Sequence, residues 1–227
     1  MFSNNDITHT ETFTIADEAY ISKILNEYAP DRTILSSVID HNEEIEIILK
    51  EKTSFLKLSS KTLLPFTLPV TKPETMGSDR LALAAAAVSQ FPGQNNLVIG
   101  LGSCITYNFI NKSKEFLGGS ISPGLEMRLK SLHTFTSKLP LIRQDWNFPL
   151  IGYDTRTNIL SGVILGMTKE IDGIIDEYSQ KYRNFNVLLT GGDAPYFARH
   201  LKNMIFADLQ LIFKGLYAIC EHNETKI

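Results

Sequence analysis

The sequence contains few cysteines and no long hydrophobic run. Only two of its 227 residues are cysteine, Cys104 and Cys220, and neither lies in a metal-ligand or redox spacing. We therefore expect a reducing, cytoplasmic setting. No apolar run approaches the roughly 20 residues that a membrane-spanning helix needs, so we expect no contact with a membrane. The first residues, MFSNNDITHTETF, have neither the basic nor the apolar part of a signal peptide.

The chain also lacks the charge and the motifs of several common function classes. With 22 basic and 25 acidic residues its formal charge is −3, which argues against nucleic-acid binding. Its five histidines are scattered without zinc-ligand spacing, and no Walker A sequence occurs. Ser36 and Ser37 have no nucleophile-elbow context, so a serine hydrolase has little support.

What the sequence does contain is the alternating pattern of an α/β protein. Hydrophobic residues make up 43% of the chain and charged residues 21%, as in globular proteins. Strands and helices alternate along the chain. The simplest explanation of this pattern is two α/β halves joined near residues 60–76. The predicted elements are strand 7–15, helix 16–28, strand 32–39, helix 43–52, strand 54–59, a long loop 60–76, a helix with Ser78 as N-cap, a hairpin 95–110, strand 115–121, a helix from just after Pro123 to Pro140, helix 155–182, strand 185–189, a glycine turn into a helix, and a final strand and helix.

The sequence MGSDR places two charged residues side by side at the predicted start of a helix. The helix macrodipole keeps the Asp79 carboxylate ionised, so it can accept a proton from a hydroxyl held nearby. Arg80 can hold a substrate carboxylate in a two-point fork. The alternative is that Asp79 only complements the dipole and that Arg80 is a solvated surface residue.

Glycine-rich turns are the other candidates. Gly191 and Gly192 end an apolar strand and open a helix, which lets the backbone approach a nucleotide. Ser103, in the turn after Gly100, can present backbone N–H groups and a hydroxyl to a phosphate. Ordinary strand–helix and hairpin turns have the same composition, so both explanations stay open from these residues alone.

Taken in order, five segments resemble the type III pantothenate kinases, including the related Bvg accessory factor proteins. They are GSDRLALAAAA, GLGSCITYNF, GGSISPGLEMRLKSLHTFTSKLP, DTRTNILSGVILG and LLTGGDA, and the match covers nearly the whole chain. The resemblance implies an α/β fold of two ribonuclease H-like lobes of the acetate/sugar kinase, Hsp70 and actin superfamily, residues 1–76 and 77–227, in a cytoplasmic homodimer. It implies ATP-dependent phosphorylation of pantothenate in coenzyme A biosynthesis, with a divalent cation such as Mg²⁺ and a monovalent cation, potassium or ammonium.

The site roles implied by the resemblance fall on motif positions of this sequence. Asp79 matches the general base, Arg80 and its neighbours in the G-x-D-R motif match pantothenate contacts, and Thr155 matches a pantothenate-binding threonine. Ser103 stands for the threonine of the family's D-x-G-T turn. The residues implied to bind pantothenate are Gly77, Ser78, Asp79, Arg80 and Thr155, and those implied to bind ATP are Ser103, Gly191 and Gly192.

The sequence also departs from the family pattern. The monovalent-cation aspartate is replaced by Gly100, an aspartate of the hairpin by Asn108, and a tyrosine of the pantothenate site by Val70. No D-x-G-N-T phosphate loop precedes Met1, so the N-terminal lobe is expected to lack its first strand. Because one cation or oxyanion contact is typically worth ~3–4 kcal/mol in a barrier, we expect weak or absent kinase turnover. The alternatives are a non-catalytic binding or regulatory protein and a kinase for another small hydroxy acid.

Overall fold

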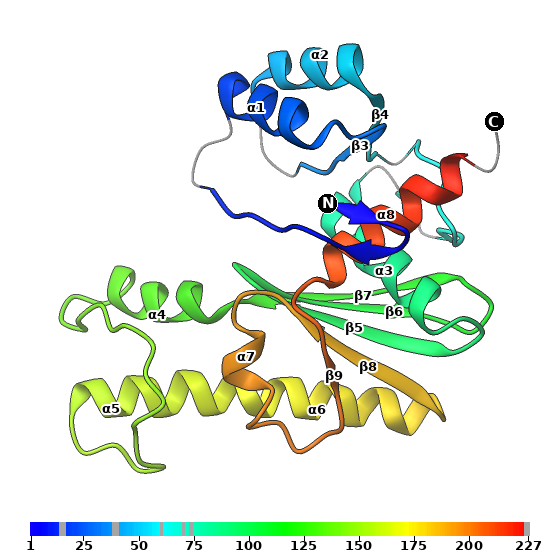
Figure 1. Ribbon diagram of the computed structural model, residues 1–227. Helices are drawn as coiled ribbons and strands as arrows, with labels where there is room; N and C mark the ends of the chain where they lie inside the picture. The colour runs from blue at the N-terminus through cyan, green and yellow to red at the C-terminus, as the bar shows by residue number, and fades with distance from the viewer. Residues whose placement is uncertain (14–16, 38–40, 60, 70, 73–74, 225–227) are drawn as a thin grey trace.

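The central feature of the fold is a five-stranded mixed sheet (Figure 1). The computed structural model describes residues 1–13, 17–37, 41–59, 61–69, 71–72 and 75–224. Strands β5 and β6 form the predicted hairpin, and the sheet order is β7-β6-β5-β8-β9, with β5, β6 and β7 antiparallel and β8 and β9 parallel to β5. The strands are β5 Asn95–Leu101, β6 Cys104–Ile110, β7 Phe116–Pro123, β8 Phe185–Thr190 and β9 Phe206–Ala207.

Helices cover both faces of this sheet, so its three central strands, β6, β5 and β8, are largely buried on both sides. One face carries α4, α5, α6 and α7, and the other carries α3 and α8. Alternate residues of β6 separate the two sides, since Tyr107 and Phe109 pack toward α6 and Ile110 toward α3. The helices are α3 Ser78–Gln90, α4 Leu125–Thr134, α5 Thr155–Leu160, α6 Gly166–Lys181, α7 Ala194–Phe197 and α8 Leu211–Glu224.

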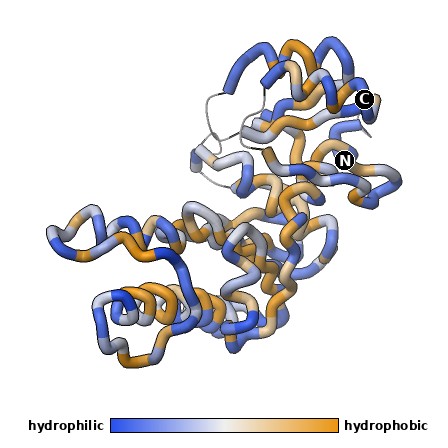
Figure 2. The backbone as a smooth tube through the Cα atoms, turned by 60° about the vertical axis from the view of Figure 1, so that its left-hand side comes forward, coloured by the Kyte–Doolittle hydropathy of each residue, from blue (hydrophilic) through white to orange (hydrophobic). Residues whose placement is uncertain are grey.

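The first third of the chain forms a smaller α/β unit above α3 and α8 (Figure 1). Its two strands β3 and β4 are parallel, and its two helices have a small core of their own around Leu25, Ile45 and Leu49. Both helices carry hydrophilic and hydrophobic stretches, as amphipathic helices do (Figure 2). The elements are α1 Glu18–Tyr28, β3 Arg32–Leu35, α2 Glu43–Lys52 and β4 Ser54–Lys57, with a short hairpin of β1 Phe2–Ser3 and β2 Asp6–Ile7 before them.

The segment 60–76, predicted as a long loop, is anchored where the structure describes it. Phe66 is buried against the α3–α8 side of the sheet. Thr67 pairs with the start of β7, since its N–H donates to Lys114 O and its carbonyl accepts from Phe116 N. The described part of this segment therefore extends the sheet edge by one bridge.

Several predicted elements differ from the structure. The strand predicted at 32–39 ends at Leu35. The strand predicted at 7–15 ends at Ile7, and residues 8–13 form neither strand nor helix, since their one apolar side chain, Phe13, packs on Tyr20 of α1. Residues 14 and 15 lie outside the described residues. The helix predicted to reach Pro140 ends at Thr134. The helix predicted over 155–182 is continuous to Lys181 but contains a π-helical turn, η2 Ser161–Leu165. Among the described residues, no helix combines the length and hydrophobicity of a membrane span.

Candidate active site

The G-x-D-R segment lies at the first turn of α3, as predicted, but the cap is different. Ser78 was predicted as the N-cap, and this is wrong: Gly77 is the N-cap and makes no side-chain capping hydrogen bond. Ser78 is already helical, and its hydroxyl is turned toward the end of β3. A local sequence pattern cannot distinguish a serine that caps its own helix from one that bonds a distant segment.

Gly77 leaves room for the carboxylate of Asp79. A Cβ built on Gly77 would lie 2.5 Å from Asp79 Oδ1, closer than real side chains approach. The backbone of Gly77 has φ −60° and ψ 137°, a conformation open to every residue, so the requirement for glycine here is steric and not conformational. The carboxylate therefore turns back over the start of the helix.

Ser78 connects the start of α3 to the first third of the chain. Its buried hydroxyl accepts a hydrogen bond from Ser36 Oγ (2.9 Å) and donates one to Ser37 O (3.2 Å). Ser36 and Ser37 directly follow β3. The segment that carries Asp79 is thus fixed from both sides, by its own helix and by the β3 end.

Arg80 is held by the fully buried side chain of Asn108. Arg80 Nε donates to Asn108 Oδ1 at 2.6 Å, and the guanidinium carbon lies 5.6 Å from the centre of the Phe116 ring. Burial lowers the pKa of Arg80, while nearby Asp79 raises it. An arginine pKa starts so high that the guanidinium stays charged at neutral pH. Arg80 is therefore a half-buried, oriented cation and not the solvated residue of the alternative interpretation.

The two glycine turns lie side by side at the carboxyl ends of β5 and β8. Asp193 N donates to Leu101 O (3.2 Å), which joins the turn after β8 to the end of β5. Gly191 has φ +101°, and a Cβ there would lie 2.2 Å from Leu101 O, so only glycine fits. The structure therefore brings Ser103 and Gly192, far apart in sequence, to the rim of one cavity.

This cavity has a volume of about 510 Å³ and is open on one side. The two turns line it together with α4 and the segment after α4, which contribute basic and acidic side chains. Burial and the neighbouring Glu126 raise the pKa of Asp193, so this carboxyl binds its proton more tightly than usual. The lining residues are Gly102, Ser103, Glu126, Leu129, Lys130, Leu141, Ile142, Arg143, Gln144, Gly192 and Asp193.

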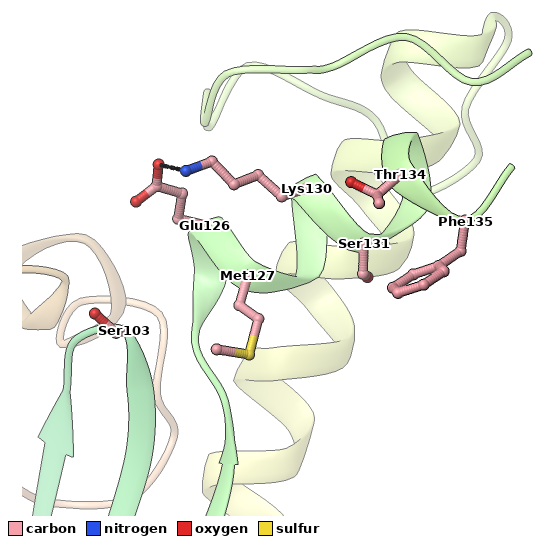
Figure 3. Close-up of a pocket in the computed structure, with 7 residues that line it drawn as sticks. All are labelled: Ser103, Glu126, Met127, Lys130, Ser131, Thr134 and Phe135. Atoms are coloured by element: carbon pink, nitrogen blue, oxygen red, sulfur yellow. Dashed lines mark ion pairs between the residues drawn. The ribbon is translucent and has the colours of Figure 1, made fainter.

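Ser103 also faces a second, smaller hollow on α4 (Figure 3). This pocket of about 360 Å³ is lined by the exposed Met127 and Phe135, and Lys130 forms an ion pair with Glu126 at 2.7 Å on its other side. The hydroxyl of Ser103 sits at the tip of the β5–β6 hairpin between the two pockets, and Gly124 N donates to Ser103 O at 3.0 Å. The tip is thereby fixed by backbone while its hydroxyl stays exposed.

Gly100 lies between the α3 segment and the glycine turns. A Cβ there would be 2.8 Å from Thr106 Oγ1 and 3.4 Å from Leu83 Cδ1, so a larger residue requires the Thr106 hydroxyl to move. No group of three or more His, Cys, Asp or Glu residues in the described ranges could hold a metal ion. The described side chains therefore do not fit a cation held by several protein carboxylates.

Comparisons with known proteins show the family of this chain. The family description "Type III pantothenate kinase" matches residues 3–177. A type III pantothenate kinase of Christiangramia forsetii is 41% identical over 228 residues, covering 100% of this chain and 94% of its own length. One from Bacteroides fragilis is 44% identical over 208 residues, covering 91% and 86%. The chain belongs to the type III pantothenate kinase family.

A solved structure supports the fold of this family member. The crystal structure of a conserved Baf family protein from Campylobacter jejuni has a TM-score of 0.57 and 24% identity, covering 90% of this chain and 89% of its own. At that identity the likeness shows the fold alone. With the five-stranded sheet, it confirms the expected α/β fold.

Thr155 lies on the opposite face of the sheet from the helix that carries Asp79. It is the exposed first residue of α5, capped by Asp154, whose pKa is lowered by hydrogen bonds from the Thr157 backbone and side chain. The helix α5 packs on the α6 face of the sheet, whereas α3 packs on the opposite face. One chain therefore does not bring Thr155 and Asp79 together.

Two polar residues of the site were missed as contributors, Asn108 and Ser36. The sequence singled out Asn108 only as a departure from the family pattern and Ser36 only as a rejected nucleophile. Asn108 lies within a strand and Ser36 directly after one, but nothing in the sequence indicates which distant residue either of them contacts. Val70, another departure, lies outside the described residues.

Proposed function

We propose that the chain transfers the γ-phosphoryl group of ATP to the hydroxyl of pantothenate, with Asp79 as general base. The observation that carries this proposal is the pairing of Asp79 and Arg80 at the buried start of α3 in a chain 41% identical to a type III pantothenate kinase. Asp79 accepts the hydroxyl proton as the oxygen attacks the γ-phosphorus, and ADP leaves with the electron pair of the broken P–O bond. Arg80 holds the pantothenate carboxylate.

The nucleotide is proposed to bind at the two glycine turns. Ser103, Gly191 and Gly192 line or border the same cavity and offer backbone N–H groups together with one hydroxyl. A divalent cation such as Mg²⁺ supplies charge neutralisation for the phosphates. It arrives with ATP, held chiefly by phosphate oxygens and water. Gly100 offers no carboxylate to the monovalent cation, potassium or ammonium, expected from the family.

The decisive experiment is pantothenate-dependent release of ADP, measured with ATP, Mg²⁺ and potassium, together with detection of 4'-phosphopantothenate. Product formation that disappears in Asp79→Asn supports the kinase. Binding of pantothenate in calorimetry without any product supports the non-catalytic alternative. Gly100 stands where the family has the aspartate that binds the monovalent cation. We therefore predict weak turnover, below about one per second. Faster turnover contradicts it.

A homodimer is the proposed assembly. The residues just before Thr155, Leu150, Ile151 and Tyr153, are 79%, 83% and 81% exposed, an apolar run that a second copy can cover. Thr155 and Asp79 lie on opposite faces of one sheet, so a pantothenate site that uses both needs two chains. Light scattering tests this proposal: a dimer is expected, and Ile151→Asp is expected to shift it toward monomer.

Two further parts of the proposal concern organisation. We propose that residues 1–76 and 77–227 form two lobes, supported by the separate β3–β4 pair and the five-stranded sheet. A cytoplasmic location agrees with a metabolic kinase that draws on ATP. Limited proteolysis between residues 60 and 76 tests the division, because a lobe boundary there predicts early cleavage and a stable C-terminal fragment.

A further inference from the structure

Arg128 of α4 connects the last residues of β7 to α6. Its Nε donates to Pro123 O at 2.7 Å, and its Nη2 donates to Ser122 Oγ at 2.9 Å and to Glu170 Oε2 at 2.5 Å. In the described part of the chain, the strand order gives β7 a single neighbouring strand in the sheet, β6. The guanidinium of Arg128 therefore holds the end of an edge strand that the sheet itself secures on one side only.

The Glu170 carboxylate is held in turn by two different donors. One oxygen takes the ion pair with Arg128, and the other accepts a hydrogen bond from the hydroxyl of Tyr107 at 3.3 Å. Tyr107 is fully buried on β6, and burial together with the neighbouring carboxylate raises the pKa of Tyr107, so its hydroxyl stays a proton donor at neutral pH. Because both carboxylate oxygens are engaged, Glu170 fixes the Arg128 side chain relative to the core of the sheet.

The peptide unit between Pro123 and Gly124 carries this position to the tip of the β5–β6 hairpin. Its oxygen, Pro123 O, accepts from Arg128, and its N–H, on Gly124, donates to Ser103 O at 3.0 Å. A peptide unit is planar, so orienting its carbonyl also orients its N–H. The two segments are in close contact here, since a Cβ on Gly124 would lie 2.1 Å from Gly102 O. The hydrogen bond from the cationic guanidinium also polarises the peptide and strengthens its N–H as a donor.

We propose that Arg128, paired with Glu170, is a positioning residue for the turn that binds the nucleotide. It orients the Pro123–Gly124 peptide, and this peptide sets the shape of the turn around Ser103. Arg128 acts through the backbone and not by contact with ATP. This role rests on the proposed function, in which the turn binds ATP. ATP binding should therefore depend on Arg128 and Glu170, whereas pantothenate binding, at the start of α3, should not.

Two conservative substitutions and one control test this role. Arg128→Lys keeps the charge, but one ammonium nitrogen cannot occupy the positions of both Nε and Nη2. Glu170→Gln keeps the size of the side chain, but its amide offers a single oxygen to two donors. The control is Asp176→Asn, which removes another ion-paired carboxylate of α6. Asp176 pairs with Lys202, in the segment after α7.

The first readout is amide hydrogen exchange of the ligand-free protein, followed by NMR. The Gly124 amide is expected to exchange at least tenfold faster in Arg128→Lys and in Glu170→Gln. In Asp176→Asn it should keep the wild-type rate, and the amide of Phe91, hydrogen-bonded at the end of α3, should keep its rate in all three variants. An unchanged Gly124 rate in Arg128→Lys overturns the proposal, as does equal acceleration of both amides, which would mean a general loss of stability. If Arg128→Lys does not fold, Glu170→Gln decides in the same way.

The second readout separates the two substrates. In Arg128→Lys and in Glu170→Gln the KM for ATP is expected to rise at least fivefold, while the KM for pantothenate stays within twofold of the wild-type value. Asp176→Asn should change neither. A purely structural role would raise both KM values together or lower kcat with neither KM changed, and either result overturns the proposal.

The two readouts also separate this inference from the proposed function. If Gly124 exchange responds but the wild type neither binds ATP in calorimetry nor forms product, the proposed function fails and the placing of the turn by Arg128 stands. If the wild type forms product with a KM for ATP that neither Arg128→Lys nor Glu170→Gln changes, the inference fails and the proposed function stands.

Discussion

At the start of α3 the proposed site consists of side chains held by other side chains, whereas at the two glycine turns it consists of backbone. Asp79 and Arg80 depend on Gly77, Ser36 and Asn108 for their positions. The Ser103 and Gly192 turns are fixed by main-chain hydrogen bonds to Leu101 and Gly124. The difference implies that the acceptor end is sensitive to a change of functional group, while the nucleotide end is sensitive to a change of backbone shape.

The largest expected effect comes from the acceptor end. Asp79→Asn removes the proposed proton acceptor and should lower kcat by about 10²–10⁴-fold, the usual contribution of a general base. Glu18→Gln is the matched control, because Glu18 also lies in the first turn of a helix, α1, far from the site. Steady-state kinetics measure both. A kcat within threefold of wild type in Asp79→Asn would show that another group takes the proton.

At the nucleotide end the backbone should be the sensitive part. Gly191→Ala must place a Cβ against Leu101 O at φ +101°, so the free energy of unfolding should fall by about 2–4 kcal/mol. Gly192→Ala is the control, since a Cβ there meets nothing within 4 Å and the unfolding free energy should change by less than ~0.5 kcal/mol. Urea unfolding distinguishes them. Equal effects at the two glycines would contradict the steric argument.

Ser36 tests the connection between the first third of the chain and the acceptor end. Ser36→Ala removes the donor to Ser78 and should lower the unfolding free energy by about 1 kcal/mol. We also expect a fall in kcat/KM, because the helix start that carries Asp79 loses a partner. Ser179→Ala, whose exposed hydroxyl bonds only within α6, is the control and should change neither quantity. An unchanged kcat/KM in Ser36→Ala would make the contact purely structural.

The smallest effect is expected at Ser103. Ser103→Ala removes an exposed hydroxyl but none of the backbone groups of the turn, so the KM for ATP should rise only two- to threefold, equivalent to about 0.5 kcal/mol. Kinetics with ATP varied at saturating pantothenate measure the change. A rise of a hundredfold would mean that this end, too, depends on a side chain, and the contrast between the two ends would disappear.

Much of the fold could be predicted from the sequence because it is encoded locally. The helix that follows Gly77 and the hairpin 95–110 have strong periodic patterns and clear boundaries, and both are confirmed. The strand predicted at 7–15 failed because an isolated alternating pattern forms a strand only when a partner pairs with it. The helix predicted to reach Pro140 failed because proline limits a helix without deciding how far before it the last turn ends.

The candidate site divides in the same way. Residue type and local spacing were enough to single out Asp79, Arg80 and the glycine turns, because a charged pair at a helix start and a glycine at a strand end have direct chemical consequences. Only the tertiary structure decided that Asn108 holds Arg80, that Gly192 joins Ser103 at one cavity, and that Thr155 lies on the other face of the sheet. These are contacts between residues far apart in sequence. They are determined by how the sheet and its helices pack, which no local pattern specifies.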